Sequence, residues 1–155
     1  MRYEDCSENL VETFLRVLEE RFPNKAYLKY KLIFDTKKSV SKGRFILASV
    51  ALASEKIKFF TKDDMAVDGY DYVLTVNKKA WDLATDEDKK RLISHEMRHV
   101  FVDEKGSPKL VGHEIEDFYE EIKLNQDDPE WSRKLGRLAL DVYEQEKEMK
   151  KELKN

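Results

Sequence analysis

The sequence predicts a single domain that contains both helices and a β-sheet. Apolar residues recur with helical spacing near the N-terminus and again in the second half of the chain, whereas they alternate with polar residues between positions 26 and 77. No repeat, low-complexity linker or change of composition divides the 155 residues, a length usual for one domain. We therefore expect one unit over residues 1–155, with a core at about 5–143 and a charged helix end at 144–155.

The first half of the chain is predicted to form one helix followed by the strands of the sheet. The helix should begin at Asp5, which forms a capping box with Glu8, and end at Phe22 before Pro23. Alternation of apolar and polar residues predicts strands at 26–34, 44–51, 54–60 and 70–77. The segment 44–51 is apolar on both faces, which places it in the middle of the sheet.

The second half of the chain is predicted to be mainly helical. A short helix at 78–83 precedes a longer one that begins at Thr85, a residue type favoured at helix N-termini. A run of turn-forming residues at 103–108 should then reverse the chain in a small hairpin. Further helices are expected at 113–124 and from Pro129 onward.

Composition narrows the classes of partner and compartment. The net charge of -3 gives no general attraction to nucleic acid or to an anionic membrane. Cys6 is the only cysteine, so no internal disulfide is possible, as is usual in a reducing compartment. The first ten residues contain no apolar run, and no segment has the length of a membrane span. These features predict a cytoplasmic protein without a membrane partner.

The sequence His95-Glu96-Met97-Arg98-His99 carries the clearest chemical signal. On a helix, this His-Glu-x-x-His pattern places two imidazoles one turn apart on one face, with a carboxylate beside them. A helical wheel places His95, Glu96 and His99 on the border between a core side and a solvent side. The core side consists of Leu92, Ile93, Met97, Val100 and Phe101, and the solvent side of Arg91, Ser94 and Arg98. The pattern is typical of zinc hydrolases, and it predicts Zn2+ as the cofactor.

A catalytic zinc ion takes three protein ligands, and the third must come from elsewhere in the chain. The spacing used by metzincins is ruled out, because its glycine and histidine positions are occupied by Val102 and Lys105. We favour His113, because it is the one remaining imidazole among the 3 His and begins the next predicted helix. Asp117 is a candidate to orient its ring. The alternatives are the carboxylates Glu114, Glu116, Glu120 and Glu121.

These residues predict a metallopeptidase that acts on a peptide or protein substrate. Glu96 would serve as general base, taking a proton from the attacking water and passing it to the leaving amine. Tyr119 and Tyr143 are candidates for the group that stabilises the oxyanion. The alternative function is a catalytically idle module that binds nucleic acid or a partner protein. It would use one of two basic clusters, Lys37, Lys38, Lys42 and Arg44 or Lys89, Lys90 and Arg91.

Four segments together carry a resemblance to a known family, namely 43–49, 70–77, 95–99 and 112–118. In these segments the chain resembles the putative phage metallopeptidase family and, more distantly, SprT-like and minigluzincin zinc proteases. The resemblance implies a small α+β, zincin-like domain. In such a domain a twisted, mostly antiparallel sheet of three to four strands packs on helices, and an edge strand lies above the active-site helix.

The resemblance also assigns roles to individual residues. His95, His99 and His113 match the metal ligands of the family, and Glu96 matches its general base. Arg98 departs from the small or apolar residue frequent at its position. SprT-like proteins often add a Cys-rich zinc ribbon or a DNA-binding tail, and this chain shows neither, so DNA-linked substrates are not expected. In a zincin-like fold, the strand 70–77 could bind a peptide as an additional strand.

Overall fold

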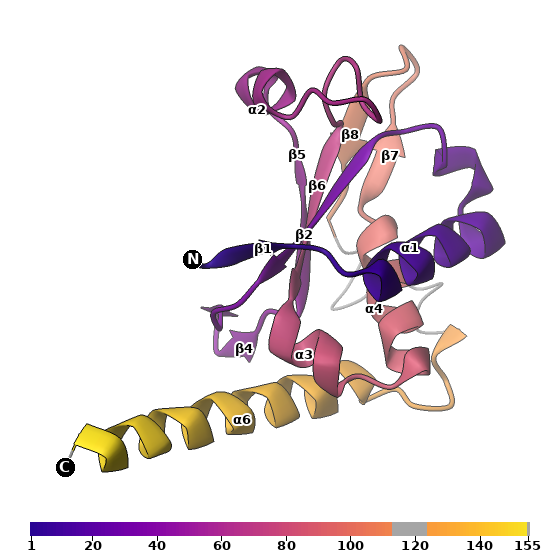
Figure 1. Cartoon of the computed structure of the whole chain (residues 1–155). Helices are drawn as coiled ribbons and strands as arrows, with labels where there is room; N and C mark the ends of the chain where they lie inside the picture. The colour runs from indigo at the N-terminus through magenta and orange to yellow at the C-terminus, as the bar shows by residue number, and fades with distance from the viewer. Residues whose placement is uncertain (113–123, 155) are drawn as a thin grey trace.

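The chain forms a four-stranded sheet with helices packed against it, in a computed structural model that describes residues 1–112 and 124–154 (Figure 1). The strand order is β1 (Tyr3–Asp5), β2 (Tyr30–Asp35), β6 (Tyr72–Asn77) and β5 (Ala48–Leu52). The central pair, β2 and β6, is parallel, and each outer strand pairs in the antiparallel sense. This mixed sheet, with a long helix at the C-terminal end, confirms the predicted α+β class and fits a small zincin-like domain.

Some helices lie beside one face of the sheet, and the others lie at its two ends (Figure 1). Their bounds are α1 (Glu8–Arg21), the 3-10 turn η1 (Pro23–Lys25), α2 (Glu55–Phe60), α3 (Lys78–Leu83), α4 (Asp86–Met97) and α6 (Trp131–Lys154). Helices α1 and α4 pack together against the sheet, and α3 packs against α6. Two hairpins complete the described structure, β3 (Val40–Ser41) with β4 (Arg44–Phe45) and β7 (Val100–Val102) with β8 (Pro108–Leu110).

The hydrophobic core lies between the sheet and the pair of helices α1 and α4. Leu32 and Phe34 are buried from β2, as the alternation in the sequence predicts. An aromatic stack crosses this layer, with ring centroids 5.1 Å apart for Phe14 and Tyr30 and 5.6 Å apart for Tyr30 and Tyr72. The stack joins α1 to the two central strands, which are the most buried strands of the sheet, and α4 packs against α1 and β5.

The N-terminal segment differs from the prediction. Residues 3–5 pair with β2, so Asp5 belongs to a strand, and Ser7 caps α1 by accepting a hydrogen bond from the Leu10 amide. The strand β1 is held by two hydrogen bonds of 2.9 Å from the Arg2 guanidinium to the Asp35 carboxylate. The predicted Asp5 cap was wrong because this ion pair joins residues 33 positions apart, which local patterns do not reveal.

Three predicted strands also need correction. The first begins at Tyr30 instead of position 26, because Pro23–Lys25 form a 3-10 turn. The segment predicted for the middle of the sheet gives the edge strand β5, whose residues are mostly exposed or half-buried. The segment 54–60 is the helix α2, capped by the Ser54 side chain. Its phenylalanines contribute to the exposed surface instead of the core, so apolar alternation there did not indicate a buried strand face.

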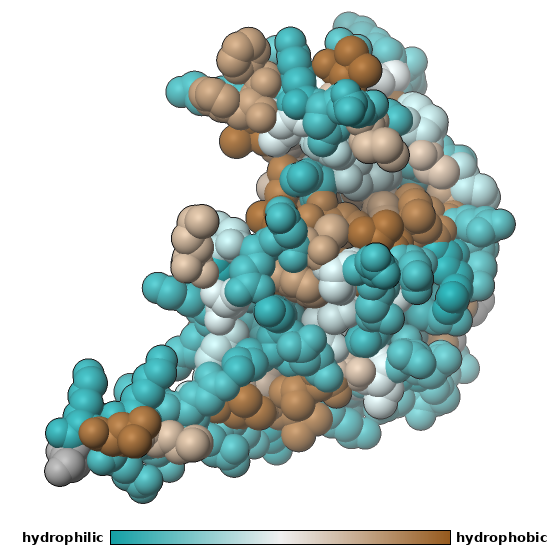
Figure 2. Space-filling model, viewed as in Figure 1, coloured by the Kyte–Doolittle hydropathy of each residue, from teal (hydrophilic) through white to brown (hydrophobic). Residues whose placement is uncertain are grey.

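The surface is largely hydrophilic, with an apolar region over α2 and the loop that follows it (Figure 2). Phe59, Phe60, Met65 and Val67 are all at least 66% exposed. The C-terminal part of α6 extends away from the body of the molecule (Figure 2). Among the described residues, no helix combines the length and apolar character that a membrane crossing requires.

Candidate metal centre

Helix α4 is fixed at both ends by side chains. At its start, the Thr85 hydroxyl accepts a hydrogen bond of 3.1 Å from the Asp88 amide, as predicted. At its end, the Lys25 ammonium donates a hydrogen bond of 3.0 Å to the Met97 carbonyl, where a positive charge complements the helix dipole. Leu92, Ile93 and Met97 are buried in the core, as the helical wheel predicts. The helix is therefore a rigid support for the residues on its remaining face.

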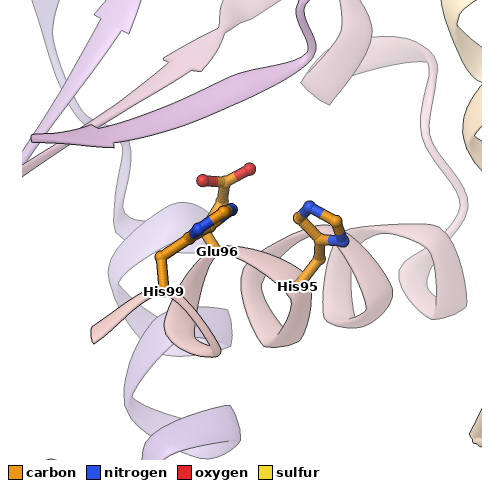
Figure 3. Close-up of side chains that lie close together, drawn as sticks. All are labelled: His95, Glu96 and His99. Carbon is orange, nitrogen blue, oxygen red and sulfur yellow. The ribbon is translucent and has the colours of Figure 1, made fainter. Parts of the chain in front are cut away.

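The three motif residues converge at the end of α4. His95, Glu96 and His99 project from the same side of the helix, and their potential ligand atoms all lie within 4.8 Å of one another (Figure 3). The two imidazole rings lie 5.5 Å apart, at 70° to each other. Both histidines are half-buried, whereas Glu96 is only 6% exposed. This arrangement matches the predicted position of the motif, on the border between core and solvent.

His99 lies two residues beyond the last residue of α4, and the hairpin holds it in place. Its ring nitrogen Nδ1 is 2.6 Å from the Val111 carbonyl oxygen, and the Val111 amide donates a hydrogen bond of 2.7 Å to the His99 carbonyl. Because a carbonyl can only accept, Nδ1 carries the proton, and Nε2 of the neutral ring keeps its lone pair. Carbonyl contacts of this kind orient metal-binding histidines in general.

The donor set fits a metal ion such as zinc. Neutral imidazole nitrogens are common ligands of zinc, copper, iron and nickel, and a zinc ion accepts carboxylate oxygen as well. On one tetrahedral zinc ion, two ligand nitrogens lie roughly 3.4 Å apart. The observed group meets this requirement after at most small side-chain rotations, because its atoms already lie within 4.8 Å. His95 and His99 can therefore bind one metal ion together.

A groove with a volume of about 880 Å³ opens over these residues. Leu92, His95, Glu96 and His99 of the α4 region line it, with Leu110 from β8. The segment 43–50, which includes β4 and most of β5, forms another wall, and the beginning of α6 contributes the remainder. The motif is thus accessible to a molecule that lies between the edge strand and α6.

The other side of α4 is more covered than the sequence predicts. Arg91 and Ser94, expected to face water, are 8% and 0% exposed, whereas Phe101, expected in the core, is 40% exposed. The Arg91 guanidinium forms ion pairs with Asp88, Asp127 and, at 3.9 Å, Asp128. Burial alone would lower the pKa of Arg91, but its hydrogen bond to Asp88 and the charges of Asp127 and Asp88 raise it. Periodicity within α4 does not reveal the burial of this side, because the elements that cover it, α1 and the segment before α6, are distant in the sequence.

Several other candidates have a different outcome. Residues 113–123 lie outside the described part of the chain. This range contains His113, the alternative carboxylate ligands, Asp117 and Tyr119. The Tyr143 hydroxyl donates to the Thr36 carbonyl at 3.0 Å and accepts from the Asn77 amide group at 3.0 Å. Tyr143 therefore connects α6 to the sheet and does not line the groove, so it is not a suitable oxyanion group.

The strand predicted to bind a peptide is not available for that role. β6 has β2 on one side and β5 on the other, so both of its hydrogen-bonding edges are occupied. The edge strand beside the motif is β5, in agreement with the edge strand that the resemblance implies. The error came from the apolar character of 44–51, which suggested a central strand although these residues line a groove.

One of the two predicted basic clusters and Cys6 also have defined environments. In the cluster around Arg91, Lys89 donates a hydrogen bond to Asn9 and lies over the Trp81 ring, so these cations serve mainly to hold α4 in the fold. Burial raises the pKa of the Cys6 thiol, which packs against the core and is not part of the His95 metal group.

The buried Tyr72 supports the metal centre from the core, a role that sequence patterns alone did not indicate. Its hydroxyl is within hydrogen-bond distance of the Phe101 carbonyl, at 3.0 Å, and of the Lys109 carbonyl, at 2.8 Å. Burial raises the pKa of Tyr72 to about 12, so the hydroxyl keeps its proton and donates at neutral pH. Tyr72 thereby fixes both strands of the hairpin that positions His99.

Replacing Tyr72 with Phe removes this donor without changing the shape of the core. We expect the free energy of unfolding to fall by about 0.5–1.5 kcal/mol, because the hairpin carbonyls lose the hydrogen bond from Tyr72. Chemical denaturation of the two proteins measures the difference. Tyr30→Phe is a matched control, because the Tyr30 hydroxyl donates to the Lys25 carbonyl and not to the hairpin. Faster amide hydrogen exchange in β7 and β8 for Tyr72→Phe alone would locate the effect, and equal exchange in both variants would contradict it.

An α+β domain whose central helix presents a convergent His-Glu-His group to an open groove has the features of a zincin-like, metal-binding domain. The family model described as putative phage metallopeptidase matches residues 2–143, and the chain therefore belongs to this family. The comparisons with curated proteins and with solved structures gave no match. Family membership implies a metal ion and a peptide or protein substrate.

Proposed function

We propose that this protein is a zinc-dependent peptidase in which His95, His99 and His113 bind the metal and Glu96 is the general base. The observation that carries the proposal is the convergence of His95, Glu96 and His99 within 4.8 Å at the base of a groove beside an edge strand. Family membership supports the class of reaction. Zinc is the metal proposed, because imidazole is one of its common ligands and the His-Glu-x-x-His pattern is typical of zinc hydrolases.

The third ligand is proposed from the chain near His99. Val111 is hydrogen-bonded to both the ring and the backbone of His99, and His113 follows it by two residues. Two residues of polypeptide span at most about 7 Å, so an imidazole at position 113 is within reach of the same metal ion. A third imidazole would complete a catalytic zinc site that keeps one position for water.

Glu96 is suited to proton transfer. Zinc, when bound, lowers the pKa of a bound water toward about 7 and polarises the carbonyl of the substrate. Glu96 accepts the proton of the attacking water and later delivers it to the leaving amine, so that the peptide bond breaks without a covalent enzyme intermediate. Because Glu96 is buried beside both imidazoles, its carboxylate keeps a fixed position next to the two histidines that would hold the metal.

Strand β5 provides a way to hold the substrate. Its outer edge is the open edge of the described sheet next to the motif, and residues 48–50 line the groove. A peptide that pairs with this edge is recognised by its main chain, which tolerates many sequences. β5 thus replaces the strand 70–77 in the role predicted from the sequence.

Metal content and peptidase activity test the proposal together. We expect the purified protein to bind one zinc ion per chain and to cleave an unfolded protein such as reduced casein. Removal of zinc with a chelator should abolish cleavage, and adding back one equivalent should restore it, because proton transfer by Glu96 needs a metal-activated water. Elemental analysis and peptide mass spectrometry give the two readouts. Cleavage that persists without metal, or protein that does not bind added zinc, would contradict the proposal.

A further inference from the structure

One end of the groove carries three arginines. Arg44 comes from β4, and Arg133 and Arg137 come from the beginning of α6; all three line the groove and are exposed. Arg133 and Arg137 are four residues apart on a helix, so their side chains lie on the same face. We refer to Arg44, Arg133 and Arg137 as the arginine cluster.

Close packing between α6 and β4 brings the arginine cluster together. A Cβ atom on Gly136 would lie 3.4 Å from the Phe45 Cβ atom, at van der Waals contact, so the backbone of α6 lies close to Phe45. The rings of Phe45 and Tyr143 add a second contact, at 6.1 Å between centroids. Arg44 precedes Phe45, and the two α6 arginines lie on either side of Gly136. The contact therefore places cations from both walls at the same end of the groove.

This end is distinct from the end near the hairpin. The ion pairs of Arg91 with Asp127 and Asp128 hold the segment before α6 against the part of α4 that precedes His95. The hairpin lies at the opposite end, where Val111 contacts His99. A peptide that passes over His95 and His99 therefore has the arginine cluster beside the residues on only one side of the bond to be cleaved.

Cations outnumber acids among the described residues that line the groove. Three of these residues are arginines and two are glutamates, Glu96 and Glu130, whereas the chain has a net charge of -3. Arg133 pairs with Glu130 at 3.3 Å, and both side chains are exposed, so this pair is weak. Glu96 is assigned to proton transfer at the metal. A groove with an excess of one sign concentrates ligands of the other sign.

We propose that the arginine cluster selects peptides with aspartate or glutamate on the side of the cleaved bond that lies toward α6. This inference rests on the proposed function and adds a substrate class to it. Guanidinium groups bind carboxylates in well-defined paired geometry, which suits recognition of acidic side chains. A peptide fits better than nucleic acid because Phe45, Leu92 and Leu140 also line the groove, and the edge of β5 matches a peptide main chain.

The first test is a cleavage-site profile on a library of peptides with mixed sequences, read by mass spectrometry. Wild-type protein should prefer Asp or Glu on one side of the bond by roughly three- to tenfold, the range expected for one or two exposed ion pairs. Arg137→Glu should remove or reverse this preference. Lys150→Glu is the matched control, because it makes the same change of charge on α6 outside the groove, and its profile should equal that of wild type. A wild-type profile with no acidic preference would overturn the inference.

The second test measures binding without hydrolysis. The Glu96→Gln variant loaded with zinc is titrated with fluorescent peptides that differ only in Glu or Gln at one position, with and without Arg137→Glu. Tighter binding of the acidic peptide that is lost with Arg137→Glu supports the inference. Absence of cleavage by the wild-type protein would count against the proposed function only, and would leave this binding result valid. Equal binding of both peptides, or displacement of the peptide by a short single-stranded DNA that binds more tightly, overturns it.

Discussion

The Glu96→Gln variant should remain folded and bind one zinc ion, yet hydrolyse peptides more slowly by roughly 100-fold or more, the usual contribution of a general base. The amide has nearly the same size as the carboxylate but cannot accept the proton of the attacking water. Because Glu96 is buried next to His95 and His99, a substitution of equal size should leave both imidazoles in place. This variant therefore separates proton transfer from metal binding.

The measurement is kcat/KM on a fluorogenic peptide chosen from the cleavage-site profile, with zinc content determined on the same samples. Glu148→Gln is a suitable control, because it changes an exposed glutamate of α6 that does not line the groove. Glu148→Gln should keep nearly full turnover. If Glu96→Gln kept wild-type turnover with its zinc intact, another group would have to serve as base, and the assignment of Glu96 would be wrong.

The His95→Ala variant should lose stoichiometric zinc and with it all peptidase activity. A structural zinc site in a small domain is worth about 10–16 kcal/mol over four ligands, so the loss of one ligand should weaken binding by roughly 100- to 1,000-fold. Competition with a chromophoric chelator measures the affinity. Retention of one tightly bound zinc ion by His95→Ala would place the metal elsewhere on the protein.

The same titration identifies the third ligand. His113→Ala should lose zinc to the same degree as His95→Ala, whereas Glu116→Ala should bind zinc as wild type does. The reverse result would assign the third position to a carboxylate, one of the alternatives that the sequence leaves open. The folded state of each variant can be followed by circular dichroism, so that loss of metal is not confused with loss of structure.

Local signals in the sequence were sufficient for much of the fold and for the centre of the site. The bounds of α3, the start of α4 at Thr85 and the hairpin after α4 were predicted correctly, because each depends on capping or turn residues close by in the chain. The helical repeat also predicted His95 and Glu96 side by side on α4, whereas His99 lies two residues beyond the end of this helix, where Val111 contacts it.

Features that depend on distant contacts could not be predicted in this way. The edge position of β5 is decided by which strands pair, and the burial of Arg91 by aspartates about 36 residues further along the chain. Lys25 supports α4 through a hydrogen bond to a residue 72 positions away. Tyr72 supports the hairpin through residues that lie 29 and 37 positions further along the chain. A helical wheel or an alternation pattern contains no information on such partners.

The hydrogen bonds between His99 and Val111 have a thermodynamic consequence. His99 lies beyond the last residue of α4, and its ring and carbonyl contact Val111 after the hairpin, so a metal ion that binds His99 also favours the paired state of the hairpin. By linkage, each tenfold increase in the free zinc concentration above its Kd adds about 1.4 kcal/mol to the free energy of unfolding. Metal supply would then set the lifetime of the folded protein as well as its activity, and the metal-free chain would be the form most readily degraded.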